Sequence, residues 1–250
     1  MIQLKSAREI DIMAHGGQIL GATVAMLRRE VRAGMSTWEL DEMAETFIRS
    51  HPGATPSFKG LYGFPGSVCV SINNEIVHGI PSRRRVLNAG DIISIDVGVK
   101  YDGYHTDSAT TVAVGAVPDE SQRLLDVTER ALAAGIQAAL PNNHVGDIGA
   151  AIQAVVEASG FSIVRDLVGH GIGAAFHEEP QVPNYGKPKR GTKLVPGLTI
   201  AIEPMVNVGG PGTRTLPDRW TVVTVDGSRS AHFEHTIAIT DNDPRVLTTA

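Results

Sequence analysis

GDIISID, residues 90–96, is matched position for position by GLTIAIE, residues 197–203, which lies 107 residues further along the chain. Each copy is a short run of apolar and β-branched residues that ends in a carboxylate, the pattern of a buried strand. One match of this length can arise by chance. Helical patterns at 36–50 and 147–160 precede the two copies at a similar spacing, however, and self-similarity at a fixed offset indicates a repeated structural unit.

Two further pairs of features keep the same order around the two copies. His78-Gly-Ile-Pro81 precedes the first copy, and His177-Glu-Glu-Pro180 precedes the second. Asp107 follows the first copy, and Glu234 follows the second. A pseudo-two-fold axis between two such halves would bring their equivalent carboxylates together at a shared interface.

The remaining pattern supplies helices and antiparallel strands to both halves. The expected helices cover residues 6–29, 36–50, 121–140 and 147–159, and the expected strands cover 67–72, 75–79, 91–100, 104–114, 161–168, 199–208, 220–225 and 231–239. The sequence therefore predicts an α+β fold in one domain, residues 1–250. Its two pseudo-two-fold-related halves, about 1–118 and 119–250, would share a single core.

Composition excludes several classes of protein. The chain has 22 Lys and Arg against 27 Asp and Glu, a formal net charge of −5, which disfavours DNA and anionic membranes as partners. The single cysteine, Cys69, allows no internal disulfide and fits a reducing compartment. Charges near the start exclude a signal-peptide core, and the longest uncharged stretches have 16 residues, short of the ~20 of a membrane span. We expect a cytoplasmic monomer.

Four carboxylates lie in or beside apolar strands, where an ionised group is costly unless it is paired or bound to a metal. They are Asp96, Asp107, Glu203 and Glu234. Taken singly, each is more often a solvated or salt-bridged residue, but together with the repeat they favour a site for hard cations. His170 stands between glycines that leave its imidazole uncrowded, so it would add a nitrogen ligand. Such a set can hold two divalent ions.

His78 and His177 occupy equivalent places in the two halves, and neither is needed to complete the ligand set. They are therefore candidates for hydrogen-bond donors beside a substrate, with turn histidines ahead of a proline as the alternative. His105 and His232 lie close in sequence to the carboxylates and are candidates for supporting the ligands.

Together these residues resemble the type I methionine aminopeptidases, M24 metallopeptidases of the pita-bread fold, and in particular the short bacterial subtype. The resemblance runs from about residue 2 to 240 and includes SVCVSINNEIVHGIP, GDIISIDVGVKYDGYHTDSA, VGHGIG, FHEEP, IAIEPM and FEHTIAIT. It implies a curved antiparallel sheet covered by helices. It also implies an enzyme that removes the N-terminal initiator methionine from nascent polypeptides when the second residue is small.

The same resemblance implies how the ligand set would be used. Asp96 would chelate one metal ion, Asp107 and Glu234 would bridge both ions, and His170 with Glu203 would hold the second. The ions would be Co, Mn, Fe, Zn or Ni, and a hydroxide bridging them would attack the first peptide bond. Backbone oxygens near Asn73 and Ser230 lie where the family can hold one monovalent cation.

The resemblance also assigns the substrate contacts. Glu203 would take the proton, His177 would stabilise the carbonyl oxygen as it gains charge, and His78 would contact the scissile amide nitrogen. The methionine pocket would be lined by Phe58, Leu61, Phe64, Cys69, His78, Phe176, His177 and Trp220. Several family members carry Cys or Tyr at positions 58, 61 and 64, so this pocket would be more hydrophobic. Cys69 is expected as a wall residue and not as a nucleophile.

Two other functions fit the same fold. An Xaa-Pro peptidase of the prolidase or aminopeptidase P type shares the five ligands but usually carries a substantial N-terminal domain. A non-catalytic pita-bread binding module typically loses metal ligands, and all five are present here. The basic loops at 83–85 and 187–193 could steer acidic partners or RNA, although solvated loops are the favoured interpretation. A transient ribosome contact is a possible partner interaction that the sequence does not decide.

Overall fold

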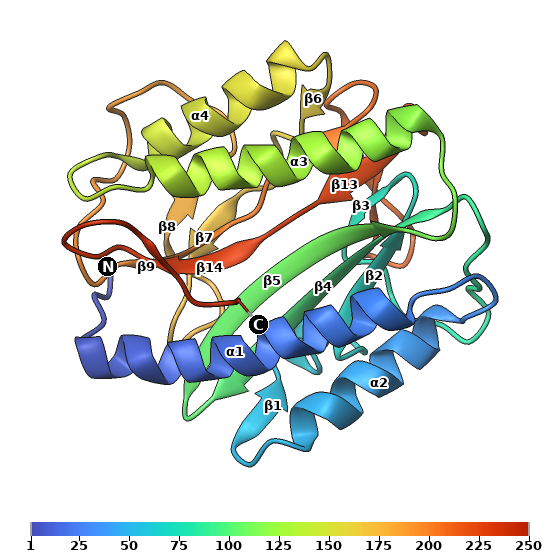
Figure 1. The fold of residues 1–250 in the computed structure, drawn as a ribbon, viewed down its shortest axis with the longest axis horizontal. Helices are drawn as coiled ribbons and strands as arrows, with labels where there is room; N and C mark the ends of the chain where they lie inside the picture. Colours follow the sequence, from blue (N-terminus) through green and yellow to red (C-terminus); the bar gives the residue numbers. More distant parts are fainter. Residues whose placement is uncertain (1, 250) are drawn as a thin grey trace.

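Two helices cover the strands of each half in the computed structural model, which describes residues 2–249 (Figure 1). Figure 1 shows the first pair in blue and the second in green and yellow. The helices are α1 (Ala7–Glu30), α2 (Thr37–Arg49), α3 (Asp119–Ala138) and α4 (Val145–Ala158), with one 3-10 turn, η1 (Leu61–Gly63). Capping boxes formed by Ser6 with Glu9 and by Ser36 with Glu39 fix the starts of α1 and α2.

Short antiparallel strands make up the other layer. They are β1 (Ala54–Pro56), β2 (Val68–Ile72), β3 (Glu75–Val77), β4 (Ile92–Tyr101), β5 (Tyr104–Ala113), β6 (Ser162–Ile163), β7 (Gly169–Gly171), β8 (Glu178–Val182), β9 (Thr199–Ile202), β10 (Met205–Asn207), β11 (Thr213–Thr215), β12 (Val222–Thr224), β13 (Ser230–His232), β14 (His235–Ala238) and β15 (Arg245–Val246).

The strand pairing repeats in the same way as the sequence does. β4 pairs with β2 and β5, whereas β9 pairs with β7 and β14, all antiparallel. β4 and β9 contain the apolar parts of the two repeated segments, so these segments occupy equivalent central positions. One apolar core lies between α1, α2 and strands β2 and β4, and a second lies between α3, α4 and strands β9, β10, β13 and β14. The expected two-part α+β architecture is confirmed.

The two halves meet along β5, where side chains bond across the junction. The Asp107 N–H donates to Thr236 Oγ1 at 2.8 Å, and Ser108 Oγ donates to the Glu234 carbonyl at 2.8 Å. Thr111 Oγ1 donates to the carbonyl of His232 at 2.9 Å. β5 and the segment β13–β14 therefore run side by side, as Figure 1 shows, and they carry carboxylates from both halves to one place.

Several predicted strands are shorter than their apolar patterns suggest. The expected strand at 199–208 is split into β9 and β10, because Pro204 has no N–H to donate and restricts the residue before it. The strand at 231–239 is interrupted at Phe233 and Glu234, where the Glu234 N–H donates to the Ala109 carbonyl instead. Strand 161–168 shrinks to β6. Both second-half carboxylates thus lie at breaks between strands.

The strands expected at 67–72 and 75–79 are present, but they do not pair with each other as a hairpin. β2 pairs with β4, and β3 pairs with β12 from the second half. A single backbone hydrogen bond from Val70 N–H to the Gly79 carbonyl, 2.8 Å, still ties the two segments together. Because β3 pairs with β12 of the second half, His78, the residue that follows β3, lies at the boundary between the halves.

α1 is the helix of residues 2–249 that is long and apolar enough, by length and composition, to cross a membrane. More than half of that stretch, 56%, is buried within the fold, where the helix packs on β4 and β5. Its apolar face therefore serves the core of the first half.

Candidate metal centre and active site

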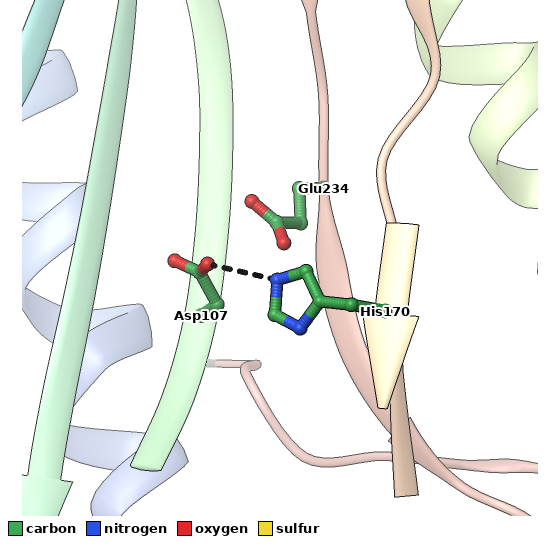
Figure 2. Close-up of side chains that lie close together, drawn as sticks. All are labelled: Asp107, His170 and Glu234. Atoms are coloured by element: carbon green, nitrogen blue, oxygen red, sulfur yellow. Dashed lines mark ion pairs between the residues drawn. The ribbon is translucent and has the colours of Figure 1, made fainter. Parts of the chain in front are cut away.

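The five predicted ligands converge between the halves. Asp96 comes from β4, Asp107 from β5 and His170 from β7, while Glu203 follows β9 and Glu234 lies between β13 and β14. Figure 2 shows Asp107, His170 and Glu234 facing one another; each offers a ligand atom within 4.8 Å of those of the other two. His170 Nε2 lies 3.9 Å from Asp107 Oδ2 and 3.7 Å from Glu203 Oε1.

The carboxylates are buried without compensation from the protein. Asp96, Asp107 and Glu234 are 8%, 4% and 1% exposed, and one oxygen of each lacks a hydrogen-bond partner. In residues 2–249 no lysine or arginine forms an ion pair with them. Burial raises the pKa of all three carboxyls and of Glu203, and the neighbouring carboxylate charges add to this for Asp107 and Glu234. Divalent cations would supply the missing charge, so the residues fit a metal site.

His170 is oriented to act as a nitrogen ligand. Its Nδ1 lies 2.8 Å from the Gly171 carbonyl oxygen, which can only accept, so Nδ1 carries the proton. The lone pair is then on Nε2, the nitrogen that faces Asp107 and Glu203. Burial, with a smaller contribution from the charge of His177, lowers the pKa of His170 to about 4 and keeps the ring neutral.

His232 lies against the same group. It is 2% exposed, and its Nε2 is 3.6 Å from Glu203 Oε2 and 3.9 Å from Glu234 Oε2. His105, the other histidine considered as a support, is bonded to Ser57 Oγ at 2.9 Å. The structure therefore brings His232 to the carboxylates and gives His105 a partner of its own.

A cavity of about 130 Å³ opens onto the carboxylates. Aromatic edges form much of its apolar side, with ring centroids 5.3 Å apart for Phe58 and Phe176 and 5.1 Å apart for Phe64 and Trp220. Its lining includes every residue predicted for the substrate pocket, namely Phe58, Leu61, Phe64, Cys69, His78, Phe176, His177 and Trp220. All five predicted metal ligands line it too: Asp96, Asp107, His170, Glu203 and Glu234.

The two candidate donor histidines reach this cavity in different ways. His78 has a left-handed backbone, φ 60°, just after β3, a conformation that non-glycine residues adopt at a cost and that recurs at functional sites. Burial, followed by the charges of His232 and His177, lowers the pKa of His78 to about 4. His177 is exposed at the rim, and its ring centroid lies 4.4 Å from that of His170.

One lining residue is absent from the sequence predictions. Tyr62, in η1, lies at the rim beside His177. Nothing in the periodicity of GLYGF, residues 60–64, indicates which way its ring points. Glycines at 60 and 63 are the only sequence signal, because they mark a tight turn.

Comparison with known proteins accounts for this combination of fold and ligand set. Residues 11–241 match the model of metallopeptidase family M24. A methionine aminopeptidase of Clostridium perfringens is 53% identical over 248 residues, which span 99% of both chains. The chain belongs to the methionine aminopeptidases of metallopeptidase family M24. A crystal structure of methionine aminopeptidase from Thermotoga maritima superposes with a TM-score of 0.98, at 41% identity and over the whole of both chains.

The M24 fold extends beyond the methionine aminopeptidases. A prolidase from Pyrococcus horikoshii has a TM-score of 0.80 at 22% identity, covering 99% of this chain and 63% of its own. At that identity the similarity concerns the fold alone. The methionine aminopeptidase relatives match this chain from end to end, which favours them over the Xaa-Pro peptidases.

Asn73 and Ser230, the residues predicted to lie near a monovalent cation, are linked through the backbone. The Ser230 N–H donates to the Asn73 carbonyl at 2.8 Å, which joins the turn before β3 to the start of β13. The Asn73 side chain donates from Nδ2 to Asp91 Oδ1 at 2.8 Å. Asn73 and Ser230 are therefore adjacent, as the prediction of a cation there requires.

Cys69 gives a simple test of the cavity wall. It is 5% exposed and stands opposite Asp96 across β2 and β4. Burial raises the pKa of the Cys69 thiol well above its ordinary value, and the charges of Asp96 and Asp107 add to the shift. Because only the thiolate reacts, we expect iodoacetamide at pH 8 to label the native protein at least about tenfold more slowly than the unfolded protein. Mass spectrometry of the only cysteine measures both rates, and equal rates would contradict a buried wall position.

Proposed function

We propose that the protein is a metal-dependent aminopeptidase that removes N-terminal methionine from polypeptides whose second residue is small. One observation carries the proposal: a cavity of about 130 Å³, apolar on one side, is lined on its other side by four carboxylates and a histidine. A cavity of this volume takes a single side chain. The peptide bond that follows this side chain then lies beside the carboxylates.

We assign the metal to the five converging residues. Asp96, Asp107 and Glu234 would share a first divalent ion, and Asp107, Glu234, His170 and Glu203 a second. Oxygen-rich ligands with one imidazole accept Mn, Fe, Co, Zn or Ni. When bound, such ions supply an activated water for attack on a carbonyl carbon and polarise the carbonyl itself.

The protein's own groups would then manage protons and charge. Glu203 is the carboxylate that we assign as proton acceptor, since it lines the cavity beside the other candidate ligands and its two oxygens face His170 and His232. His177 would donate to the carbonyl oxygen as negative charge develops there. His78, held neutral by burial, would bond the amide nitrogen that leaves.

The apolar wall selects the first residue. Phe58, Phe64 and Phe176 are 6%, 4% and 5% exposed and pack edge to face, which leaves a narrow slot suited to an unbranched, polarisable side chain. Leu61 also lines the cavity and extends this apolar wall. This wall offers an incoming charged side chain no partner.

A peptide assay tests the function. Met-Ala-Ser should be cleaved at least about 50-fold faster, in kcat/KM, than Met-Leu-Ser, because a bulky second side chain displaces the scissile peptide bond from His78 and His177. N-acetyl-Met-Ala-Ser is the control for the free amine, and Leu-Ala-Ser is the control for the pocket. Cleavage of Ala-Pro or Met-Pro peptides, with Met-Ala-Ser untouched, would instead assign an Xaa-Pro peptidase.

The setting follows from the chemistry proposed. Because nascent polypeptides carry the N-terminal methionine, we place the protein in the cytoplasm. We also propose that it is a monomer and that it binds a monovalent cation near Asn73 and Ser230. A transient ribosome contact through the loop at 83–85 has less support, because Arg83 pairs with Glu42 and Arg85 pairs with Glu75.

A further inference from the structure

Tyr62 makes two contacts with His177 at the mouth of the cavity. Its hydroxyl lies 3.2 Å from His177 Nδ1, and the two rings are nearly parallel, with an interplanar angle of 16° and centroids 5.7 Å apart. This is the one hydrogen bond recorded for the His177 ring in residues 2–249. Both residues line the cavity, so whatever fixes this ring acts directly on the site.

The position of Tyr62 is built into the backbone. η1 is a tight turn in which Tyr62 has φ 51° and follows Gly60 with φ 86°. The Gly60 N–H donates to the Phe64 carbonyl at 2.8 Å, and the Phe64 N–H donates to the Leu61 carbonyl at 2.9 Å. Leu61 and Phe64 belong to the apolar wall, so the turn is anchored there, while Tyr62 itself is 72% exposed at the rim.

The backbone of His177 is held separately. Glu178, the next residue, forms an ion pair with Lys5 in which the two side chains are 8% and 4% exposed. Its other oxygen accepts from the Ala175 N–H at 3.1 Å. With the loop fixed in this way, rotation of the imidazole and the choice of its protonated nitrogen are the freedoms left to His177.

The partner atoms at the two site histidines place different constraints on the tautomers of the rings. At His170 the partner of Nδ1 is a carbonyl oxygen, which can only accept and therefore requires the proton on Nδ1. At His177 the partner is a phenol hydroxyl, which can donate its proton to Nδ1. A neutral imidazole that accepts at Nδ1 carries its own proton on Nε2.

We propose that Tyr62 is a positioning residue that donates its O–H to His177 Nδ1, stacks on the ring, and so presents Nε2–H as a hydrogen-bond donor to the substrate's carbonyl oxygen. The inference rests on the proposed role of His177 and extends it to a residue that never meets the reacting atoms. The two histidines would thus have opposite tautomers, one for a ligand and one for a donor.

Two substitutions separate the hydroxyl from the ring. Tyr62→Phe keeps the stack and removes one hydrogen bond, so kcat for Met-Ala-Ser should fall about fivefold while KM changes less than about twofold. Tyr62→Ala removes both contacts and should lower kcat about 20-fold. Tyr104→Phe is the matched control: it deletes a phenol hydrogen bond to Glu9, 2.6 Å, outside the cavity and should leave kcat unchanged.

A second measurement reads the tautomer without any turnover. In zinc-loaded protein labelled with 15N-histidine, the His177 signals, assigned by comparison with His177→Gln, should show protonated Nε2 and unprotonated Nδ1. Tyr62→Phe should convert these signals to a mixture of both tautomers, and Tyr104→Phe should not. A wild-type proton on Nδ1, or a Tyr62→Phe variant with unchanged signals and unchanged kcat, would overturn the proposal. Failure of wild-type protein to cleave Met-Ala-Ser would count against the proposed function, and the spectra would still decide the role of Tyr62.

Discussion

Replacement of Glu203 by Gln should lower kcat for Met-Ala-Ser by at least about 100-fold, the lower end of what a positioned acid–base group contributes. The amide has the size of the carboxylate but cannot accept the proton. The fold should survive, because the Glu203 backbone carbonyl is held by Asn184 Nδ2 at 3.0 Å whatever the side chain is. Initial rates at saturating peptide, with metal in excess, measure the effect, and circular dichroism checks the fold.

A matched substitution shows whether the loss is local. Glu157→Gln changes the same functional group on α4, where Glu157 bonds Gln153 at 2.8 Å on the surface, and it should leave kcat unchanged. Excess metal separates the two roles of Glu203, since a lost ligand can be offset by a higher metal concentration and a lost base cannot. Activity of Glu203→Gln within tenfold of wild type would reject the assignment of Glu203 as proton acceptor.

Removal of divalent metal should abolish peptide cleavage entirely, and Mn or Co should restore it. The reason lies in the uncompensated carboxylates: without cations, Asp107 and Glu234 face each other's charge in a buried site. A chelator titration followed by addition of Mn or Co, with cleavage of Met-Ala-Ser as the readout, measures this. Full activity in protein shown to be metal-free by elemental analysis would contradict the site.

The same carboxylates predict how metal changes stability with pH. Burial raises the folded-state pKa of Asp96 and Glu203 above the unfolded values near 4, so the metal-free folded state binds more protons than the unfolded state above that pH. The free energy of unfolding of metal-free protein should therefore fall as pH rises from about 4 toward 8. Metal favours the ionised groups, so its stabilisation should grow over the same window. At 100 times its Kd, metal adds about 2.7 kcal/mol, or roughly 5–10 °C in Tm.

Differential scanning fluorimetry at pH 5 and pH 8, with and without Mn, measures this difference. Asp107→Asn is the matched variant, because it keeps the size of the side chain and removes one charge from the cluster. It should raise the Tm of metal-free protein at pH 8 and reduce the increment that metal produces. An equal metal increment at both pH values would contradict the electrostatic account.

The sequence could single out five candidate ligands that converge in the structure, because their environment can be read from alternation and repetition. Asp96 and Asp107 interrupt apolar strands that persist in the structure as β4 and β5. Glu203 and Glu234 were reached through the repeat, even though the strands expected around them are broken by Pro204 and by the bond from Glu234 to Ala109. The repeat still identifies these two residues, because equivalent sequence positions occupy equivalent places in the two halves even where the strands are shorter than expected.

What escaped prediction depends on irregular backbone. The direction of Tyr62 is set by a left-handed turn, and the pairing of β3 with β12 joins segments about 150 residues apart. Neither the left-handed turn nor this long-range strand pairing produces a periodic pattern in the amino-acid sequence. The substrate pocket was predicted by resemblance, and the structure collects all of its predicted residues around one cavity, including Phe58, Leu61 and Phe64.

The junction along β5 has a consequence for the chain before it is complete. β5 is ten residues long, and in an isolated first half the side that now meets Thr236 and Glu234 would face water. A long strand edge whose backbone N–H and C=O groups lack partners can pair with strands of other chains. During synthesis this edge therefore stays uncovered until the second half has been made. We expect the protein to be most prone to self-association in the time between synthesis of the first half and synthesis of the second.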